Sequence, residues 1–431
     1  MPILIKGGRV IDPGHIDAVC DILVEKGRIQ AVQPAGTLAP AGDQCRTIDA
    51  DGLWVTPGLL DLHVHFREPG QEYKEDIFSG SRAAAHGGFT AVCTMPNTLP
   101  VNDDPAVTAQ ILEKAAQADL IKVYPVAAVS RGSRGEQLCE FGELKAAGAV
   151  GVSDDGLPVM NSQLMRRALE YASNFGLLVI SHAEDLQLAE GGVMNEGARS
   201  TRMGLGGIPN ACESVMVMRD IALSALTGVP VHIAHVSTRE SVTAIRRAKS
   251  DGVAVTAETA PHYFTLTDEA VEGYDTHAKM NPPLRSAADR EAIRQGLADG
   301  TLDAIATDHA PHSVMEKEVE FDRAANGIIG LETALPLGLK LVSDNLLSAS
   351  DLIDRMAVAP SRILGLTTGV RVGLEADLTL IDPLKEWIVT NENIKSKSKN
   401  TPFENWTLRG QAVMTLVGGR IRLDRLHQSI G

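Results

Sequence analysis

The stretch Leu59-Leu60-Asp61-Leu62-His63-Val64-His65 is the clearest indication of the fold, because an apolar run ends there in two histidines. Side chains alternate along a β-strand, so His63 and His65 are expected on the same side, where two imidazoles can approach one ion. Other apolar runs end in a similar way. The polar residues at their ends are Asp154, Asp155, His182, His235 and Asp308. Imidazole and carboxylate ligands together suit zinc or a neighbouring divalent transition metal.

The middle of the chain, residues 57–368, alternates apolar runs with stretches of helical length. The predicted strands are residues 59–65, 90–95, 122–129, 150–153, 177–182, 229–236, 253–259 and 302–307. The predicted helices include residues 104–118, 162–174, 212–227 and 238–250. This alternation predicts an α/β fold, the (β/α)8 TIM barrel, in which functional residues gather at the carboxyl ends of the strands.

The two ends of the chain predict short β-strands instead. Residues 1–56 and 369–423 contain short β-type runs separated by turn signals such as Gly-Gly and Asp-Pro. Because chain termini often lie close together, we expect the two segments to form one composite β-sandwich domain. The barrel at 57–368 and a tail at 424–431 complete the predicted organisation.

Composition excludes several classes of partner. The formal net charge is −15, whereas binding of nucleic acid or of an anionic membrane requires a basic surface. The five cysteines show no CxxC spacing, as expected of reduced thiols in the cytosol. No apolar run reaches the roughly 18 residues of a membrane span, and the N-terminus does not resemble a secretory leader. We therefore expect a soluble, cytoplasmic protein that binds no nucleic acid and no membrane.

Two pairs of candidate residues have alternative interpretations. Asp154 and Asp155 point to opposite sides of an extended chain, and one of them could merely cap the turn before Gly156. His232 and His235 also face opposite sides of their predicted strand. Since His235 is nearer the carboxyl end, it is the better ligand, and His232 is interpreted as structural.

A set of longer strings extends the pattern over nearly the whole chain. They are Asp61-Leu-His63-Val-His65-Phe-Arg67-Glu68-Pro-Gly, Met95-Pro-Asn97-Thr, Asp154-Asp155-Gly, Ser181-His182-Ala-Glu, His235-Val-Ser237, Glu258-Thr-Ala-Pro-His262, Asn281-Pro-Pro-Leu-Arg285, Thr307-Asp308-His309-Ala-Pro-His312 and Ser396-Lys-Ser-Lys-Asn-Thr-Pro-Phe403. This pattern resembles class I dihydroorotases of the amidohydrolase superfamily. The resemblance implies zinc-dependent, reversible cyclisation of N-carbamoyl-L-aspartate to L-dihydroorotate in pyrimidine (UMP) biosynthesis.

The resemblance also implies roles for individual residues. The implied metal set is His63, His65 and Asp308 for one zinc ion, His182 and His235 for a second, and Asp155 as the bridging carboxylate. Many relatives use a carboxylated lysine as the bridge. The side chain of Asp155 is shorter, and occupancy of the second metal site depends on it here. Asp308 is in addition the implied catalytic proton carrier. The implied substrate contacts are Arg67, Asn97 and His312 for the carboxylate, Asn281 for the ring, and backbone near Gly327. Before Asn326-Gly327, this chain has Ala325 where a proline is common.

Three functions are compatible with these strings. The leading one is dihydroorotase. The second is a related cyclic amidase, hydantoinase or allantoinase, although Arg67 and the set Asn97, Asn281 and His312 favour a carboxylated ring. The third is a non-catalytic scaffold partner of aspartate carbamoyltransferase, which would be expected to have lost ligands that this chain retains. For an active enzyme we expect a homodimer. A complex with aspartate carbamoyltransferase is a candidate larger assembly.

Overall fold

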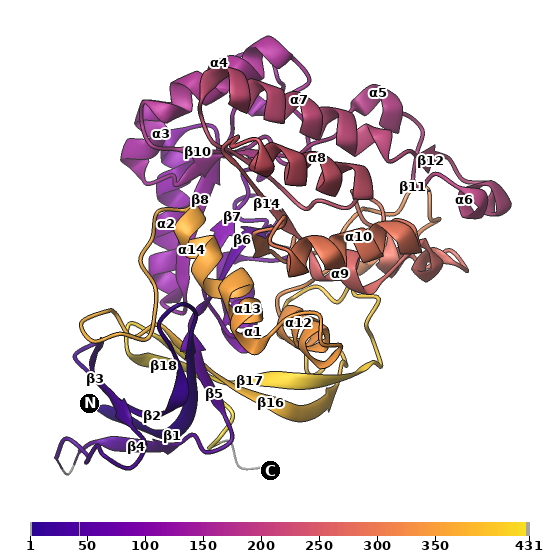
Figure 1. Cartoon of the computed structure of the whole chain (residues 1–431). Helices are drawn as coiled ribbons and strands as arrows, with labels where there is room; N and C mark the ends of the chain where they lie inside the picture. The colour runs from indigo at the N-terminus through magenta and orange to yellow at the C-terminus, as the bar shows by residue number, and fades with distance from the viewer. Residues whose placement is uncertain (1, 43, 428–431) are drawn as a thin grey trace.

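The computed structural model describes residues 2–42 and 44–427 (Figure 1). The middle of the chain forms a parallel sheet in strand order β15-β14-β13-β10-β9-β8-β7-β6. Its strands are β6 (Leu59–Val64), β7 (Phe89–Thr94), β8 (Lys122–Ala127), β9 (Gly151–Val152), β10 (Leu178–Ser181), β13 (Val231–Ile233), β14 (Val255–Thr259) and β15 (Ala304–Ile305). A parallel bridge between Val64 and His309 joins the first strand to the segment after the last. The predicted TIM barrel is therefore confirmed, with all eight strands in chain order.

Helices follow the barrel strands and cover their outer face (Figure 1). The helices are α1 (Ile77–Gly87), α2 (Pro105–Ala118), α3 (Phe141–Ala147), α4 (Ser162–Ser173), α5 (Leu186–Ala189), α6 (Ala198–Met203), α7 (Ala211–Thr227), α8 (Arg239–Ser250), α9 (Pro261–Thr265), α10 (Ala287–Ala298), α11 (Val314–Lys317), α12 (Ala334–Ser343), α13 (Ala349–Ile353) and α14 (Ala359–Ile363). Short 3-10 turns lie at Arg131–Ser133, Asp268–Val271 and Thr276–Ala278, and a π-helical turn lies at Asp354–Val358.

Capping side chains explain where the predicted helices begin. The Asp104 carboxylate accepts a hydrogen bond from the Ala106 amide, and Pro105 occupies the first turn of α2, where its missing N–H costs nothing. In α8 the Thr238 hydroxyl caps the Ser241 amide in the same way. The observed starts of both helices therefore lie within a residue of the predicted ones.

Strands from both ends of the chain form a second sheet. Its strands are β1 (Ile3–Asp12), β2 (Ile16–Glu25), β3 (Arg28–Pro34), β4 (Arg46–Asp49), β5 (Trp54–Pro57), β16 (Leu378–Ile388), β17 (Thr407–Val417) and β18 (Arg420–Asp424). The order is β18-β17-β16-β5-β1-β2-β3, with β4 paired to β1. The N-terminal and C-terminal halves meet where β5 pairs antiparallel with β16. The predicted domain bounds stay a prediction, and residues 428–431 of the predicted tail lie outside the described part.

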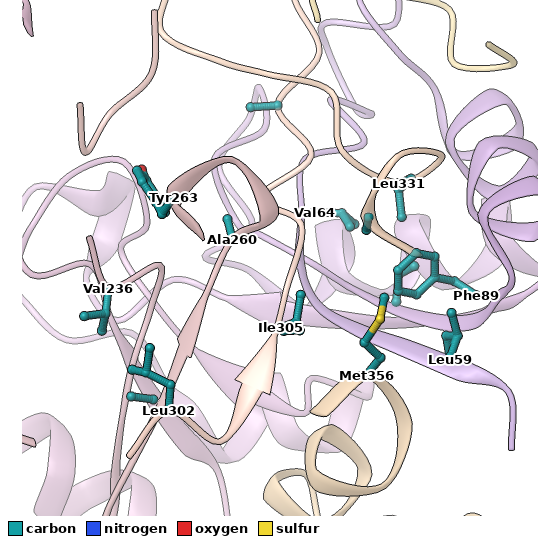
Figure 2. Close-up of a cluster of buried hydrophobic side chains, with 14 of the residues drawn as sticks. Leu59, Val64, Phe89, Val236, Ala260, Tyr263, Leu302, Ile305, Leu331 and Met356 are labelled. Atoms are coloured by element: carbon teal, nitrogen blue, oxygen red, sulfur yellow. The ribbon is translucent and has the colours of Figure 1, made fainter. Parts of the chain in front are cut away.

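Apolar side chains fill the barrel on both faces of its strands. The larger cluster packs the outer strand faces against the helices, and Figure 2 shows some of its members, including Leu59, Phe89 and Met356. A smaller cluster takes alternate strand positions, such as Ala91 and Cys93, and contains several alanines. These inward side chains fill the interior of the barrel, so no channel runs through it. A reaction site is therefore expected at the carboxyl ends of the strands. No helix in the described ranges is both long and apolar enough to cross a bilayer.

Candidate metal centre and substrate pocket

The two histidines of the first strand converge on a common centre. The rings of His63 and His65 lie 5.2 Å apart between centroids, as the alternation of strand side chains predicted. The register between β6 and β7 shifts between Asp61 and Val64, so β6 carries an extra residue at this point. Such bulges redirect side chains near active sites. The bulge was not predicted from the sequence.

The six predicted metal ligands come together at the carboxyl end of the barrel. His63 Nε2 lies 3.2 Å from Asp155 Oδ1, and His65 Nε2 lies 3.1 Å from Asp308 Oδ1. Two overlapping groups of ligand atoms lie within 4.8 Å of one another. One contains His63, His65 and Asp308, and the other contains His63, Asp155 and His235. His182 joins them because its Nδ1 lies 2.8 Å from His235 Nε2 and 3.5 Å from Asp155 Oδ1.

The donor set fits a divalent metal. Within the described part of the chain, His63 Nε2 and Asp155 Oδ1 are both buried, and neither makes a hydrogen bond of acceptable geometry. Buried polar atoms without a partner are rare, and a cation between them would satisfy both. Imidazole nitrogens and carboxylate oxygens are also the ligands that zinc accepts. These atoms therefore fit the implied metal, although their role as ligands stays a prediction.

The two aspartates of the centre remain ionised near neutral pH. Burial opposes ionisation of Asp155, but His63, His182 and His235 outweigh it and hold the pKa of this carboxyl well below its ordinary value. Burial also opposes ionisation of Asp308, whose pKa is nevertheless lowered because His63 and His65 lie beside it. Two ionised carboxylates in one buried centre favour binding of a cation.

A second buried carboxylate orients His63 from behind. His63 Nδ1 lies 3.0 Å from Glu258 Oε1, and Glu258 Oε2 lies 3.2 Å from His232 Nε2. Burial raises the pKa of Glu258, but the neighbouring His232 and His63 outweigh it and lower that pKa to about 2. Metal-binding histidines commonly hold a carboxylate with their other nitrogen, which fixes the tautomer. His232 thus lies behind the centre, in the structural role that its place in the strand indicated.

The neighbouring aspartate, Asp154, points away from the centre. Its carboxylate accepts hydrogen bonds from the backbone amide and the hydroxyl of Ser130. The two acidic residues therefore separate as alternation predicted, with Asp155 facing the histidines and Asp154 holding the loop after β8.

Four of the five predicted substrate contacts line one cavity above the centre. Its volume is about 280 Å³, close to the lower end of the range of about 300–1,000 Å³ for small-ligand sites. The lining residues are His65, Arg67, Asn97, Asp155, Gly156, His182, His235, Met280, Asn281, Asp308, Ala310, His312 and Asn326. The fifth predicted contact, Gly327, is buried beside the cavity, and Asn326 takes its place in the wall.

Arg67 is the cation of this cavity. Its Nε donates a hydrogen bond of 3.2 Å to Pro311 O, and its Nη2 lies 3.3 Å from His312 Nε2. Burial lowers the pKa of Arg67 to about 10, so the guanidinium keeps its charge at neutral pH. Burial and the charge of Arg67 lower the pKa of His312, which is therefore neutral. The cavity thus offers one fixed positive charge beside the negative centre.

Two amides link the substrate pocket to the histidines. Asn97 Oδ1 lies 2.8 Å from His65 Nδ1, which leaves Asn97 Nδ2 as the donor that could reach a substrate. Asn281 Nδ2 donates to the Glu184 carboxylate at 3.2 Å, and Glu184 Oε2 lies 3.1 Å from His182 Nε2. Asn97 therefore contacts a predicted metal ligand directly, whereas Asn281 is connected to one through Glu184.

Three residues of the site adopt left-handed backbone conformations. The φ angles are 61° at Arg67, 35° at His235 and 47° at Asp308. Residues with a Cβ rarely adopt positive φ, and such strain clusters at functional sites where the surrounding structure enforces it. All three lie just after a barrel strand, where the chain turns sharply to direct a side chain into the cavity.

Glu184 and Glu258 are site residues that the sequence reasoning missed. Both belong to the motifs that carry the family resemblance, but no role was predicted for either. Each glutamate stands at or just after the carboxyl end of an apolar strand. A buried carboxylate without a partner would be costly there, so this position could have indicated a paired role. Only the contacts with His63 and His182 identify them as supports for the centre.

Comparisons with known proteins find relatives along the whole chain. Residues 52–241 match a family model described as dihydro-orotase-like. A curated dihydroorotase of Geobacter metallireducens is 57% identical over 427 residues, which cover 99% of this chain and 100% of the relative. A dihydroorotase of Geotalea daltonii is 58% identical over 423 residues, with 98% and 99% covered. Among solved structures, the L-hydantoinase (dihydropyrimidinase) of Arthrobacter aurescens has a TM-score of 0.87 at 26% identity, covering 98% of this chain and 96% of that chain.

Proposed function

This chain belongs to the dihydroorotase family, and from that membership we propose that it interconverts N-carbamoyl-L-aspartate and L-dihydroorotate in pyrimidine biosynthesis. It is a metal-dependent cyclic amide hydrolase that acts on a small molecule. The observation that carries the proposal is the cavity in which Arg67 lies beside the buried histidine and aspartate cluster. A carboxylated cyclic amide needs both features, one to hold its carboxylate and one to act on its amide bond.

Zinc is the proposed metal, with two ions per chain. His63, His65 and Asp308 would hold one ion, His182 and His235 the other, and Asp155 both. A bound zinc ion polarises an amide carbonyl and lowers the pKa of water, which makes both reactants of hydrolysis more reactive. Glu258 and Glu184 would orient the imidazoles through the contacts described above.

Asp308 is the proposed proton carrier. Its carboxylate lines the cavity and is ionised near neutral pH, so it can accept a proton from the attacking water. It then gives the proton to the amide nitrogen, which cannot leave as an anion. The reverse sequence returns the proton during cyclisation. One carboxylate can thus serve as base in one direction and as acid in the other.

Arg67 is the proposed anchor of the substrate carboxylate. A guanidinium presents two parallel N–H groups to a carboxylate, which fixes the orientation as well as the position of the ring. Asn97 and His312 lie in the same wall, and Asn281 lines the cavity with them. Gly327 is proposed to contribute through the backbone of its loop.

Hydantoinase activity is the competing proposal, since the similar solved structure carries that name. The assay that separates them measures hydrolysis of L-dihydroorotate, hydantoin and allantoin by purified protein, together with metal content per chain before and after chelation. We expect turnover of dihydroorotate alone and its loss with the metal. Faster turnover of hydantoin would refute the proposal, and inactivity on all three by metal-loaded protein would favour a scaffold.

We also propose a homodimer, a cytoplasmic location and, as a candidate assembly, a complex with aspartate carbamoyltransferase. Light scattering coupled to gel filtration, with and without the carbamoyltransferase, measures the first and the third directly. Two chains per particle is the expected result for the protein alone.

A further inference from the structure

A segment far from the barrel in sequence reaches into the loops of the cavity. Residues 394–403, called the strap here, form part of the yellow connection between β16 and β17 in Figure 1. Two buried carboxylates hold its first half. Glu332 accepts hydrogen bonds from the amides of Lys395 and Ser396, and Glu75 accepts one of 3.1 Å from the amide of Lys397. The strap is therefore a fixed part of the barrel mouth.

Asn400 connects the strap to the loop that carries His312. Its side chain is buried, with 2% of its surface exposed. Asn400 Oδ1 accepts a hydrogen bond of 3.0 Å from the His312 amide. Its Nδ2 donates to Ala310 O and to Gly327 O, both at 2.9 Å. A side-chain amide has two donors and one acceptor oxygen, and here all of them hold the same loop.

A second buried side chain supports the same part of the loop. Lys317, with 1% of its surface exposed, donates through Nζ to Ala325 O at 2.8 Å and to Gly327 O at 3.1 Å. Gly327 O thus receives hydrogen bonds from both Lys317 and Asn400. These contacts join the beginning of the loop, at Ala310, to its end, at Gly327.

The two ends of this loop pack closely against each other, so a shift at one end would be transmitted to the other. A Cβ at Gly327 would lie 2.5 Å from Ala310 O and 2.6 Å from His312 Cδ2, so the two halves of the loop are in direct contact. Pro311 lies between Ala310 and His312, both of which Asn400 holds, and Pro311 O accepts the hydrogen bond of Arg67 Nε. A shift of this backbone would therefore displace Arg67 and His312 together.

We propose that Asn400 is a positioning residue for substrate binding, which holds the backbone at Ala310, His312 and Gly327 so that Arg67 and His312 face the substrate carboxylate. This inference rests on the proposed function. Asn400 does not line the cavity, so it acts through the residues that do. Its loss should weaken binding of the carboxylate while the metal centre stays intact.

The test compares Asn400→Ala with a matched change in the same strap, Ser398→Ala. Ser398 is also buried, but its hydroxyl donates to Lys74 O and does not touch the loop. For Asn400→Ala we expect a rise of at least tenfold in KM for dihydroorotate, a change of less than threefold in kcat, and wild-type metal content. Hydrogen exchange at the His312 amide should accelerate, because its acceptor is lost. For Ser398→Ala we expect wild-type KM and exchange.

Asn400→Asp covers the case in which the alanine variant does not fold. It keeps the volume and the acceptor for His312 but loses both donors to Ala310 and Gly327, so KM should rise in the same way. An unchanged KM in whichever Asn400 variant folds, or an equal rise in Ser398→Ala, would overturn the proposal. Failure of the proposed function looks different, because wild-type protein would then not hydrolyse dihydroorotate while the exchange test at His312 still applies.

Discussion

Asp303 precedes strand β15 and Asp308 follows it. Asparagine substitutions at these two positions therefore form a matched pair of variants. Asp308→Asn keeps the shape but removes the proton-carrying carboxylate, so kcat for dihydroorotate hydrolysis should fall by about 100-fold to 10,000-fold. Asp303 pairs with Lys249 at 2.6 Å, away from the cavity, so Asp303→Asn should affect thermal stability alone. Steady-state kinetics and melting curves of the two zinc-loaded variants test this. A loss below tenfold for Asp308→Asn would contradict the proton-carrier role.

Arg67→Lys separates substrate binding from chemistry. Lysine keeps the charge but loses the planar pair of donors, so KM should rise at least tenfold for carbamoyl-aspartate and for dihydroorotate, with metal content unchanged. The control is Arg219→Lys, because Arg219 pairs with Asp220 outside the cavity. If KM for both substrates stays at the wild-type value in Arg67→Lys, Arg67 does not hold the carboxylate.

At the scale of a single element, the loop of residues 308–328 contains a buried lysine that should make stability depend on pH. Burial lowers the pKa of Lys317 to about 7, whereas in the unfolded chain it is about 10.4. Between these values the unfolded chain binds more protons than the folded one. The contribution of Lys317 to stability therefore rises with pH across this window, by at most about 1.4 kcal/mol per pH unit.

The measurement is urea unfolding of wild-type protein and Lys317→Met at pH 7 and pH 9.5. The stability of the wild type relative to the variant should be greater at pH 9.5. Lys385→Met, a change at an exposed lysine, controls for effects of removing a charge. A wild-type advantage that is equal at both pH values would show that Lys317 stays protonated throughout.

The elements also show how far sequence reasoning extends. The barrel strands were predictable because each is an apolar run that ends in polar residues, and the starts of α2 and α8 because Asp104 and Thr238 cap them. The bulge in β6 was not, since register depends on the partner strand. Glu258, Lys317 and Asn400 also escaped, because their roles depend on contacts between residues distant in sequence. Asn400 stood in a quoted string, but no periodicity connects it to His312.

For the whole molecule, proton balance predicts how the two directions of the reaction depend on pH. Cyclisation turns a carboxylate into a neutral amide and so consumes a proton, while hydrolysis releases one. Cyclisation should therefore be faster at mildly acidic pH and hydrolysis at alkaline pH, with one titrating group shared by the two profiles. Measuring kcat/KM in both directions across pH tests this on zinc-loaded enzyme. Two profiles that rise together would exclude Asp308 as the shared carrier.

Removal of the metal should also weaken the whole fold. Asp155 and Asp308 lie together in a buried centre, and a cation that binds only the folded state stabilises it by mass action. Treatment with a chelator should abolish activity and lower the melting temperature by several degrees, and zinc should restore both. An unchanged melting temperature after measured loss of metal would show that the centre does not depend on the cation for its stability.

The pairing of β5 with β16 and the anchoring of His312 by Asn400 have a consequence for how the protein is made. A ribosome synthesises the barrel strands well before residue 400, so the nascent chain carries every proposed metal ligand while the loop at His312 still lacks its anchor. Until residues 378–388 have been synthesised, β5 also has an open edge where β16 will later pair. A message that ends before codon 400 would therefore encode every proposed metal ligand but not the proposed anchor of the His312 loop. If Asn400 positions the loop as proposed, tight substrate binding should begin only after the strap has been synthesised.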